Sequence, residues 1–184
     1  SWDDLDPEVD LHEIEIPGEG TIWFGSRVFD EGDGTYRYEY AIFNLNVDRS
    51  IGAMRLPWSD GNPLNSSTHK APEWHSGEQF SNTGWTMSSG GGEMVWSSEP
   101  FASNEMANAI RWGNLQNITI VTTAQPEAGT VTLDMFKPGD FSSLFVDTQV
   151  PGNSTVAINF PSGTPDALSP TVGTELLMEV TPLE

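Results

Sequence analysis

Two histidines and a glutamate stand close together in the middle of the chain, in the order His69, His75 and Glu78. Imidazole and carboxylate groups are common ligands of zinc, copper and iron. Pro72 rules out a helix through this segment, so the three side chains would have to converge on a loop. The sequence therefore predicts a transition-metal site at His69, His75 and Glu78. The alternative is that His75 bonds a backbone carbonyl group and that Glu78 caps a turn.

Tryptophan is the second residue type that could carry a function, because the chain has 7 Trp among its 184 residues. Exposed indole rings can stack on the flat faces of sugar rings, since indole combines a large apolar surface with a polar N–H group. We predict a carbohydrate-binding surface formed by Trp74, Trp85 and Trp58. Trp74 is the most exposed of the three, because it lies between Pro72 and a polar segment. The alternative is that these rings, with Trp96 and Trp112, fill a core that is short of aliphatic residues.

No catalytic group can be assigned from the sequence. The chain contains no GxSxG motif, and no serine can be paired with a histidine and an aspartate. A glycosidase pair of acids carries no weight in a chain with 27 Asp and Glu. Residues 30–34 form a glycine-rich loop with three acids that could bind calcium, but it lacks the ligand spacing and closing glutamate of a calcium-binding loop. The sequence therefore favours a protein without enzymatic activity.

The charge of the chain limits its partners. The formal net charge is −20, from 7 basic and 27 acidic residues. Binding to nucleic acid or to an anionic membrane needs clusters of Lys and Arg, so both partners are excluded. No apolar run is long enough to insert into a bilayer, and the absence of cysteine excludes disulfides and thiolate sites. The remaining partners are a polysaccharide or further copies of the same protein.

Alternating hydrophobicity predicts the fold. In the segment YRYEYAIFNLNVDRS, residues 36–50, the first eight residues alternate with a period of two, which is typical of a half-buried strand. Asn44, Asn46 and Asp48 then favour a turn, so the strand is expected to have a polar exit. Further strands are expected at residues 12–16, 21–29, 51–58, 117–123, 130–136, 143–150, 155–160 and 175–180, and residues 85–87 and 94–96 are expected to form a hairpin. Residues 59–68 are expected to form a polar loop. We predict an all-β, antiparallel β-sandwich, Ig-like or jelly-roll, with Greek-key connections.

The predicted sandwich is a single domain over residues 1–184. Residues 1–10, SWDDLDPEVD, form an acidic N-terminal arm, and a start at Ser1 is typical of a mature or trimmed product. The one short helix expected lies at residues 103–109, where Ser103 could cap it. An extended arm of this kind could add a strand to the sheet edge of a neighbouring subunit.

Several motifs resemble those of one group of proteins. They are IPGEG at residues 16–20, YRYEYAIFNLNVDRS at 36–50, WHSGE at 74–78, NAIRWGNLQNITI at 108–120 and GTVTLDMFKPG at 129–139. Their order and spacing are similar to those of uncharacterised secreted proteins of planctomycetes and related marine bacteria, over residues 14–139. The two histidines with the SGE tail also recur in this resemblance. It implies an exported or cell-surface location and no activity.

The sequence therefore predicts a secreted or cell-surface, non-enzymatic β-sandwich with a structural, adhesive or assembly role. The alternatives are a carbohydrate-binding module that uses Trp74 and its neighbours, and a metal-binding protein or enzyme at His69, His75 and Glu78.

Overall fold

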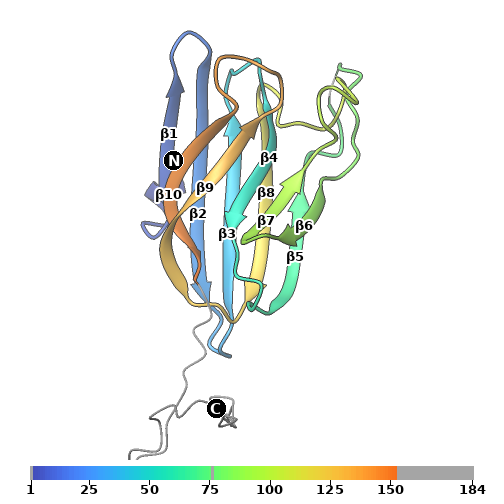
Figure 1. Cartoon of the computed structure of the whole chain (residues 1–184). Helices are drawn as coiled ribbons and strands as arrows, with labels where there is room; N and C mark the ends of the chain where they lie inside the picture. The colour runs from blue at the N-terminus through green and yellow to red at the C-terminus, as the bar shows by residue number, and fades with distance from the viewer. Residues whose placement is uncertain (1, 76, 153–184) are drawn as a thin grey trace, which may run out of the picture. The chain divides into compact units, whose positions relative to one another are not determined.

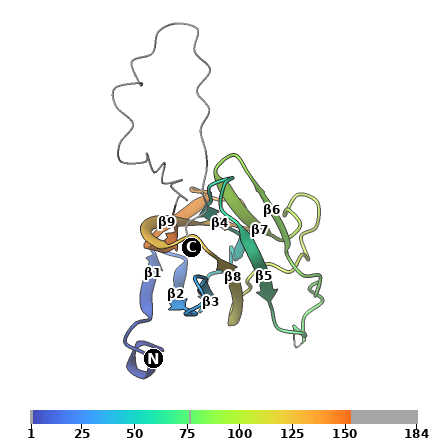
Figure 2. The same ribbon diagram turned by 90° about the horizontal axis from the view of Figure 1, so that it is seen from below.

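The computed structural model describes residues 2–75 and 77–152, all of which belong to a unit formed by residues 1–154. Strands dominate these residues, and the single helix among them, α1 (Trp2–Leu5), is one turn long. The strands form two five-stranded antiparallel sheets, which face each other when the molecule is viewed from below (Figure 2). The prediction of an all-β antiparallel sandwich is therefore confirmed.

The first sheet has the strand order β1-β2-β3-β8-β5. Its strands are β1 (Asp10–Ile16), β2 (Gly20–Asp30), β3 (Tyr36–Asn44), β8 (Asn114–Thr122) and β5 (Leu64–Lys70). The second sheet has the order β10-β9-β4-β7-β6, formed by β10 (Ser143–Pro151), β9 (Pro126–Met135), β4 (Ile51–Pro57), β7 (Glu93–Ser97) and β6 (Thr86–Gly90). The chain crosses between the sheets after β3, β4, β5, β7 and β8 (Figure 1).

The core lies between the sheets, where the alternating side chains of β3 point inward as predicted. Tyr38, Tyr40 and Ile42 are buried, and the two tyrosine hydroxyls donate hydrogen bonds to the carbonyl groups of Ala124 and Gln149. Burial raises the pKa of both phenols, because the ionised ring would lose its hydration. These rings therefore contribute apolar area to the core while their polar ends remain hydrogen bonded.

β3 ends at Asn44, the first of the three residues that were expected to favour a turn. The Asn44 amide donates to the carbonyl groups of Val47 and Ile110, and its oxygen accepts from the Val47 N–H group. These bonds close a turn, which is the usual behaviour of asparagine at a strand end.

The N-terminal arm packs against its own chain. β1 pairs with β2 along its whole length, and the Trp2 ring covers Gly25, where a Cβ atom would lie 2.8 Å from it. Asp6 and Glu8 form ion pairs with Arg27. The arm is therefore occupied within its own subunit, which is evidence against its proposed role of docking on a neighbour.

Two local predictions were wrong. Residues 103–109 form turns, because the Asn104 side chain accepts a hydrogen bond from the Met106 N–H group and so competes with helical bonding. Part of the loop predicted at residues 59–68 belongs to β5, which lies at a sheet edge. Its side chains are mostly polar, so the sequence shows no alternation of apolar and polar residues there. The hairpin predicted around residues 85–96 is present as β6 and β7.

The strands predicted at residues 155–160 and 175–180 lie outside the described residues. Among the described residues, no helix has both the length and the apolar character needed to cross a membrane.

Candidate functional site

Two long connections between strands lie against each other at one end of the sandwich. Residues 71–85 join β5 to β6, and residues 98–113 join β7 to β8 (Figure 1). They contact each other directly, since the Ser81 N–H group donates to the Met106 carbonyl and the Asn108 amide donates to the Thr83 carbonyl. Long connections without secondary structure are uncommon in compact domains and are often functional. We call these two segments the loop pair.

A network of polar side chains holds the loop pair to the first sheet. His69 Nε2 lies 2.8 Å from Gln116 Oε1, and Gln116 Nε2 lies 3.4 Å from Asn108 Oδ1. The same Asn108 oxygen accepts from His75 Nε2 at 3.0 Å, and Asn114 Nδ2 lies 3.4 Å from His75 Nδ1. The network therefore runs from β5 through β8 to both members of the loop pair.

His69 occupies the inner end of this network. Its Nδ1 atom accepts a hydrogen bond from the Trp85 N–H group at 3.3 Å, so its Nε2 atom carries the proton donated to Gln116. The imidazole stacks on the Trp85 ring, with 5.0 Å between the ring centroids. Burial lowers the pKa of His69, because the charged ring would lose hydration with no acid nearby to compensate, although the Gln116 hydrogen bond raises it in part. The geometry thus fixes a neutral imidazole.

Arg111 connects the two members of the loop pair. Its guanidinium lies 4.1 Å from the ring centroid of Phe80 and 4.5 Å from that of Phe136. It also donates hydrogen bonds to the carbonyl groups of Glu105 and Ala107, each 2.8 Å away. Burial lowers the pKa of Arg111. A planar cation between two rings suits arginine and no other basic residue.

The three residues predicted as metal ligands do not come together. Both ring nitrogens of His69 and both of His75 take part in hydrogen bonds, and the amides of Gln116 and Asn108 lie between the two rings. The Glu78 side chain is exposed. Within residues 2–75 and 77–152, no group of three His, Asp or Glu side chains could hold a metal ion. The residues present therefore do not fit a transition metal, and the two histidines act as structural hydrogen-bonding groups.

The acidic loop at residues 30–34 is a hydrogen-bonded turn. Asp30 accepts from the Gly32 N–H group, and Asp33 accepts from the N–H and hydroxyl groups of Thr35. These bonds lower the pKa of Asp33. Glu31 pairs with Arg37. The three acids of this loop thus each have a hydrogen-bonding or ion-pair partner in the chain.

The tryptophans divide into buried and exposed residues. Trp58 and Trp85 keep only 5% and 8% of their surface exposed, because both lie in the core, and Trp85 donates its indole N–H to the Asn108 carbonyl at 2.6 Å. Because they are buried, Trp58 and Trp85 cannot contact a carbohydrate, and their assignment to the predicted binding surface was wrong. Trp74 is 79% exposed, and Trp112, which the predicted surface did not include, is 73% exposed.

The two most exposed tryptophans, Trp74 and Trp112, lie on the two members of the loop pair. Trp74 directly precedes His75, and Trp112 stands two positions before Asn114, which contacts the His75 ring. The polar network thus ties together the backbone segments that carry both indoles. An exposed ring on a fixed segment can bind a flat apolar surface without first losing loop entropy.

Sequence analysis missed Asn108, Asn114 and Gln116. A signal for two of them was present, since Asn114 and Gln116 continue the inward-facing positions of Ile118 and Ile120 on β8. Polar residues on the buried face of a strand indicate a buried hydrogen-bonding network. Asn108 lies in an irregular segment, where no pattern marks it.

A comparison with family models and with curated proteins finds no match to this sequence. The function therefore has to be inferred from the geometry of the site.

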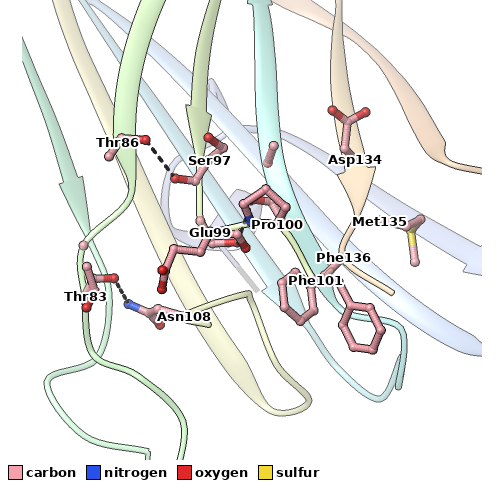
Figure 3. Close-up of a pocket in the computed structure, with 14 residues that line it drawn as sticks. Thr83, Thr86, Ser97, Glu99, Pro100, Phe101, Asn108, Asp134, Met135 and Phe136 are labelled. Carbon is pink, nitrogen blue, oxygen red and sulfur yellow. Dashed lines mark hydrogen bonds between the residues drawn. The ribbon is translucent and has the colours of Figure 1, made fainter. Parts of the chain in front are cut away.

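A hollow of about 510 Å³ is lined by residues of both members of the loop pair and of β4, β6, β7 and β9 (Figure 3). Thr83 and Asn108 line it and are hydrogen bonded to each other, and Phe101 and Phe136 supply an apolar wall. The Glu99 carboxylate is held by the Asn104 amide, and Asp134 is held by Arg55. Both acids that line the hollow are therefore engaged by side chains of the same chain.

Proposed function

We propose that this protein is a non-enzymatic, extracellular module that adheres to glycans through Trp74 and Trp112. The observation that carries the proposal is the exposure of both indoles on the two long connections that the network of His75, Asn108 and Asn114 ties together. Tryptophan is enriched at binding surfaces, because its ring covers a large apolar area while its N–H group can still form a hydrogen bond. A sugar ring offers a flat C–H face of the kind that an indole can cover.

The neighbouring groups support a binding role. Trp74 lies on the first member of the loop pair. None of its described residues at positions 71–75 and 77–84 is buried, so this part of the chain contributes little to the core. It is nevertheless held by hydrogen bonds of His75 and by the contact between Phe80 and Arg111. A segment that is fixed in place without adding to the core is typical of a binding surface.

The extracellular location rests on the resemblance to secreted proteins described above. The acidic surface is compatible with it, because a net charge of −20 keeps a protein soluble and dispersed. An adhesive role fits a binding surface without catalytic groups. Immunolabelling of intact cells that express the protein naturally should find it outside the cytoplasm.

The test is glycan binding by the wild type and by three single variants. Trp74→Ala and Trp112→Ala should each weaken binding about tenfold or more, equivalent to about 1.4 kcal/mol. Phe145→Ala is the matched control, because Phe145 is 72% exposed but lies on β10, at the far edge of the other sheet. Equal loss in all three variants, or no binding to any glycan by the wild type, would disprove the proposal.

A second candidate is self-assembly through β6. This strand lies at a sheet edge, and all five of its residues are exposed and uncharged. The other edge strands carry charges, such as Asp10 on β1, Lys70 on β5 and Asp147 on β10, which protect an edge from pairing. Two copies of an acidic molecule would meet with least repulsion at β6.

The test is light scattering. Ser88→Lys should abolish the dimer, whereas Thr68→Lys on β5 should leave it intact. A wild type that stays monomeric at all concentrations would disprove this candidate.

A further inference from the structure

The basic residues of the chain are almost all engaged in the fold. All seven Lys and Arg lie between positions 27 and 137, within the described residues. Five of them form ion pairs with acids of the same chain: Arg27 with Asp6 and Glu8, Arg37 with Glu31 and Glu39, Arg49 with Glu19, Arg55 with Asp134 and Glu93, and Lys137 with Asp48. Arg111 is buried against carbonyl groups and rings.

Lys70 is the exception, since it is exposed and has no ion pair with any described residue. It stands at the end of β5, immediately before the first member of the loop pair. A single ammonium group at an exposed position contributes little to binding at physiological ionic strength. Polyanions are bound by clusters of cations, and the surface of this protein offers no such cluster.

The surroundings of the exposed tryptophans are acidic. Glu73 directly precedes Trp74, and Glu78 follows in the same connection; both carboxylates are exposed. Glu105 is exposed in the other connection, which carries Trp112. An anionic ligand on this surface would meet like charges on both connections, in addition to a net charge of −20.

We propose that the glycan recognised by Trp74 and Trp112 is uncharged, composed of neutral hexose, pentose or N-acetylated units, and that sulfated and uronic-acid polysaccharides are rejected. This inference rests on the proposed function and specifies its ligand class. Stacking needs no charge on the ligand, whereas the carboxylates of Glu73, Glu78 and Glu105 repel sulfate and uronate groups. Discrimination thus comes from repulsion as well as from attraction.

The experiment is affinity electrophoresis of the full chain in gels that contain one polysaccharide each. The neutral panel holds cellulose derivatives, β-1,3-glucan, xylan, mannan and soluble chitin oligomers, and the anionic panel holds alginate, pectin and a sulfated galactan. Chitosan is left out, because a strongly acidic protein binds any polycation. Each gel is run at neutral pH with EDTA and with added calcium, and hits are measured by calorimetry at about 20 mM and about 500 mM NaCl, which brackets the range of strong and weak screening.

The expected result is retardation by at least one neutral glycan, lost in Trp74→Ala, with a Kd that changes less than twofold between the two salt concentrations. Lys70→Gln should leave this binding unchanged. Retardation by an anionic glycan that Trp74→Ala abolishes, with or without calcium, would overturn the ligand class while leaving glycan binding intact. Retardation by no glycan in either panel would overturn both the ligand class and the proposed function.

Discussion

His75 Nε2 lies 3.0 Å from Asn108 Oδ1, and this contact joins the two connections that carry the exposed tryptophans. The Asn108 side chain also donates to the Thr83 carbonyl, and its backbone carbonyl accepts the indole N–H of Trp85. One asparagine thus links both members of the loop pair to a core tryptophan. Its amide orientation is fixed, because its nitrogen faces a carbonyl and its oxygen faces an N–H group.

Replacement of Asn108 by alanine should therefore destabilise the protein. The change removes the acceptor of the His75 N–H group and of the buried Gln116 amide, and a buried polar group without a partner costs about 1–3 kcal/mol. Urea unfolding should show a free energy of unfolding that is lower by that amount, with a correspondingly lower midpoint. Asn82→Ala, at an exposed position of the same loop pair, is the control and should change the free energy of unfolding by less than about 0.5 kcal/mol. Equal midpoints for the two variants would contradict a supporting role for Asn108.

Stability should fall as the pH is lowered, because burial lowers the pKa of His69 in the folded protein. The unfolded chain, with an ordinary histidine pKa of about 6.5, binds a proton more readily than the folded chain. The stability that neutral His69 contributes is therefore fully present above the pKa of the unfolded chain. It is lost as the pH falls through the lower pKa of the folded protein. Protonation also removes the acceptor for the Trp85 N–H group.

His69→Gln should flatten the dependence of the unfolding midpoint on pH between about 7 and 5, the range in which an ordinary histidine titrates. Asn82→Ala is the control, since Asn82 lies at an exposed position of the same loop pair and has no titratable group, so the slope should stay in place. Thermal unfolding followed by circular dichroism at several pH values gives the measurement. An unchanged slope in the His69 variant would show that another group governs the acid response.

The fold could be predicted from the sequence because most of the strands carry their own local signal. The alternation of Tyr38, Tyr40 and Ile42 identifies the inner face of β3 without knowledge of any partner strand. β5 gave no such signal. It is an edge strand whose two faces are both partly exposed to solvent, so its apolar residues do not alternate with polar ones. Its place in the sheet is determined by pairing with β8, a contact between distant segments.

The site was less predictable, because its parts are brought together by long-range contacts. His69 and Gln116 are 47 positions apart, and His75 and Asn108 are 33 apart. Nearby histidines and acids suggested a metal, yet the fold places amides between the two imidazoles. Trp74 could be recognised from its proline-bounded polar segment. Trp112 could not be distinguished from a core tryptophan, because it directly follows the buried run that ends at Arg111.

The tryptophans should separate cleanly into residues of the core and residues of the surface. Trp85→Ala removes a buried ring that stacks on His69, and a change of this kind costs about 3–5 kcal/mol. Trp74→Ala and Trp112→Ala should change the free energy of unfolding by less than about 0.5 kcal/mol, since both rings face water. Acrylamide should quench the fluorescence of the Trp85→Ala variant more strongly than that of the wild type, provided that the variant is folded. A large stability loss in either surface variant would indicate that its ring is buried.

Arg111→Lys should weaken the junction between the loop pair and the second sheet. Lysine keeps the charge but cannot lie flat between Phe80 and Phe136 while it donates to two carbonyl groups. We expect a loss of about 1–2 kcal/mol in the free energy of unfolding, as for other lost hydrogen bonds of charged groups. Hydrogen exchange should also be faster at the Ser81 amide, which bonds the Met106 carbonyl across the loop pair.

Arg55→Lys is the control, because Arg55 makes half-exposed ion pairs that lysine can replace. If both lysine variants were equally stable, the two rings would contribute nothing specific to Arg111, and the junction would depend on the network of Asn108 alone.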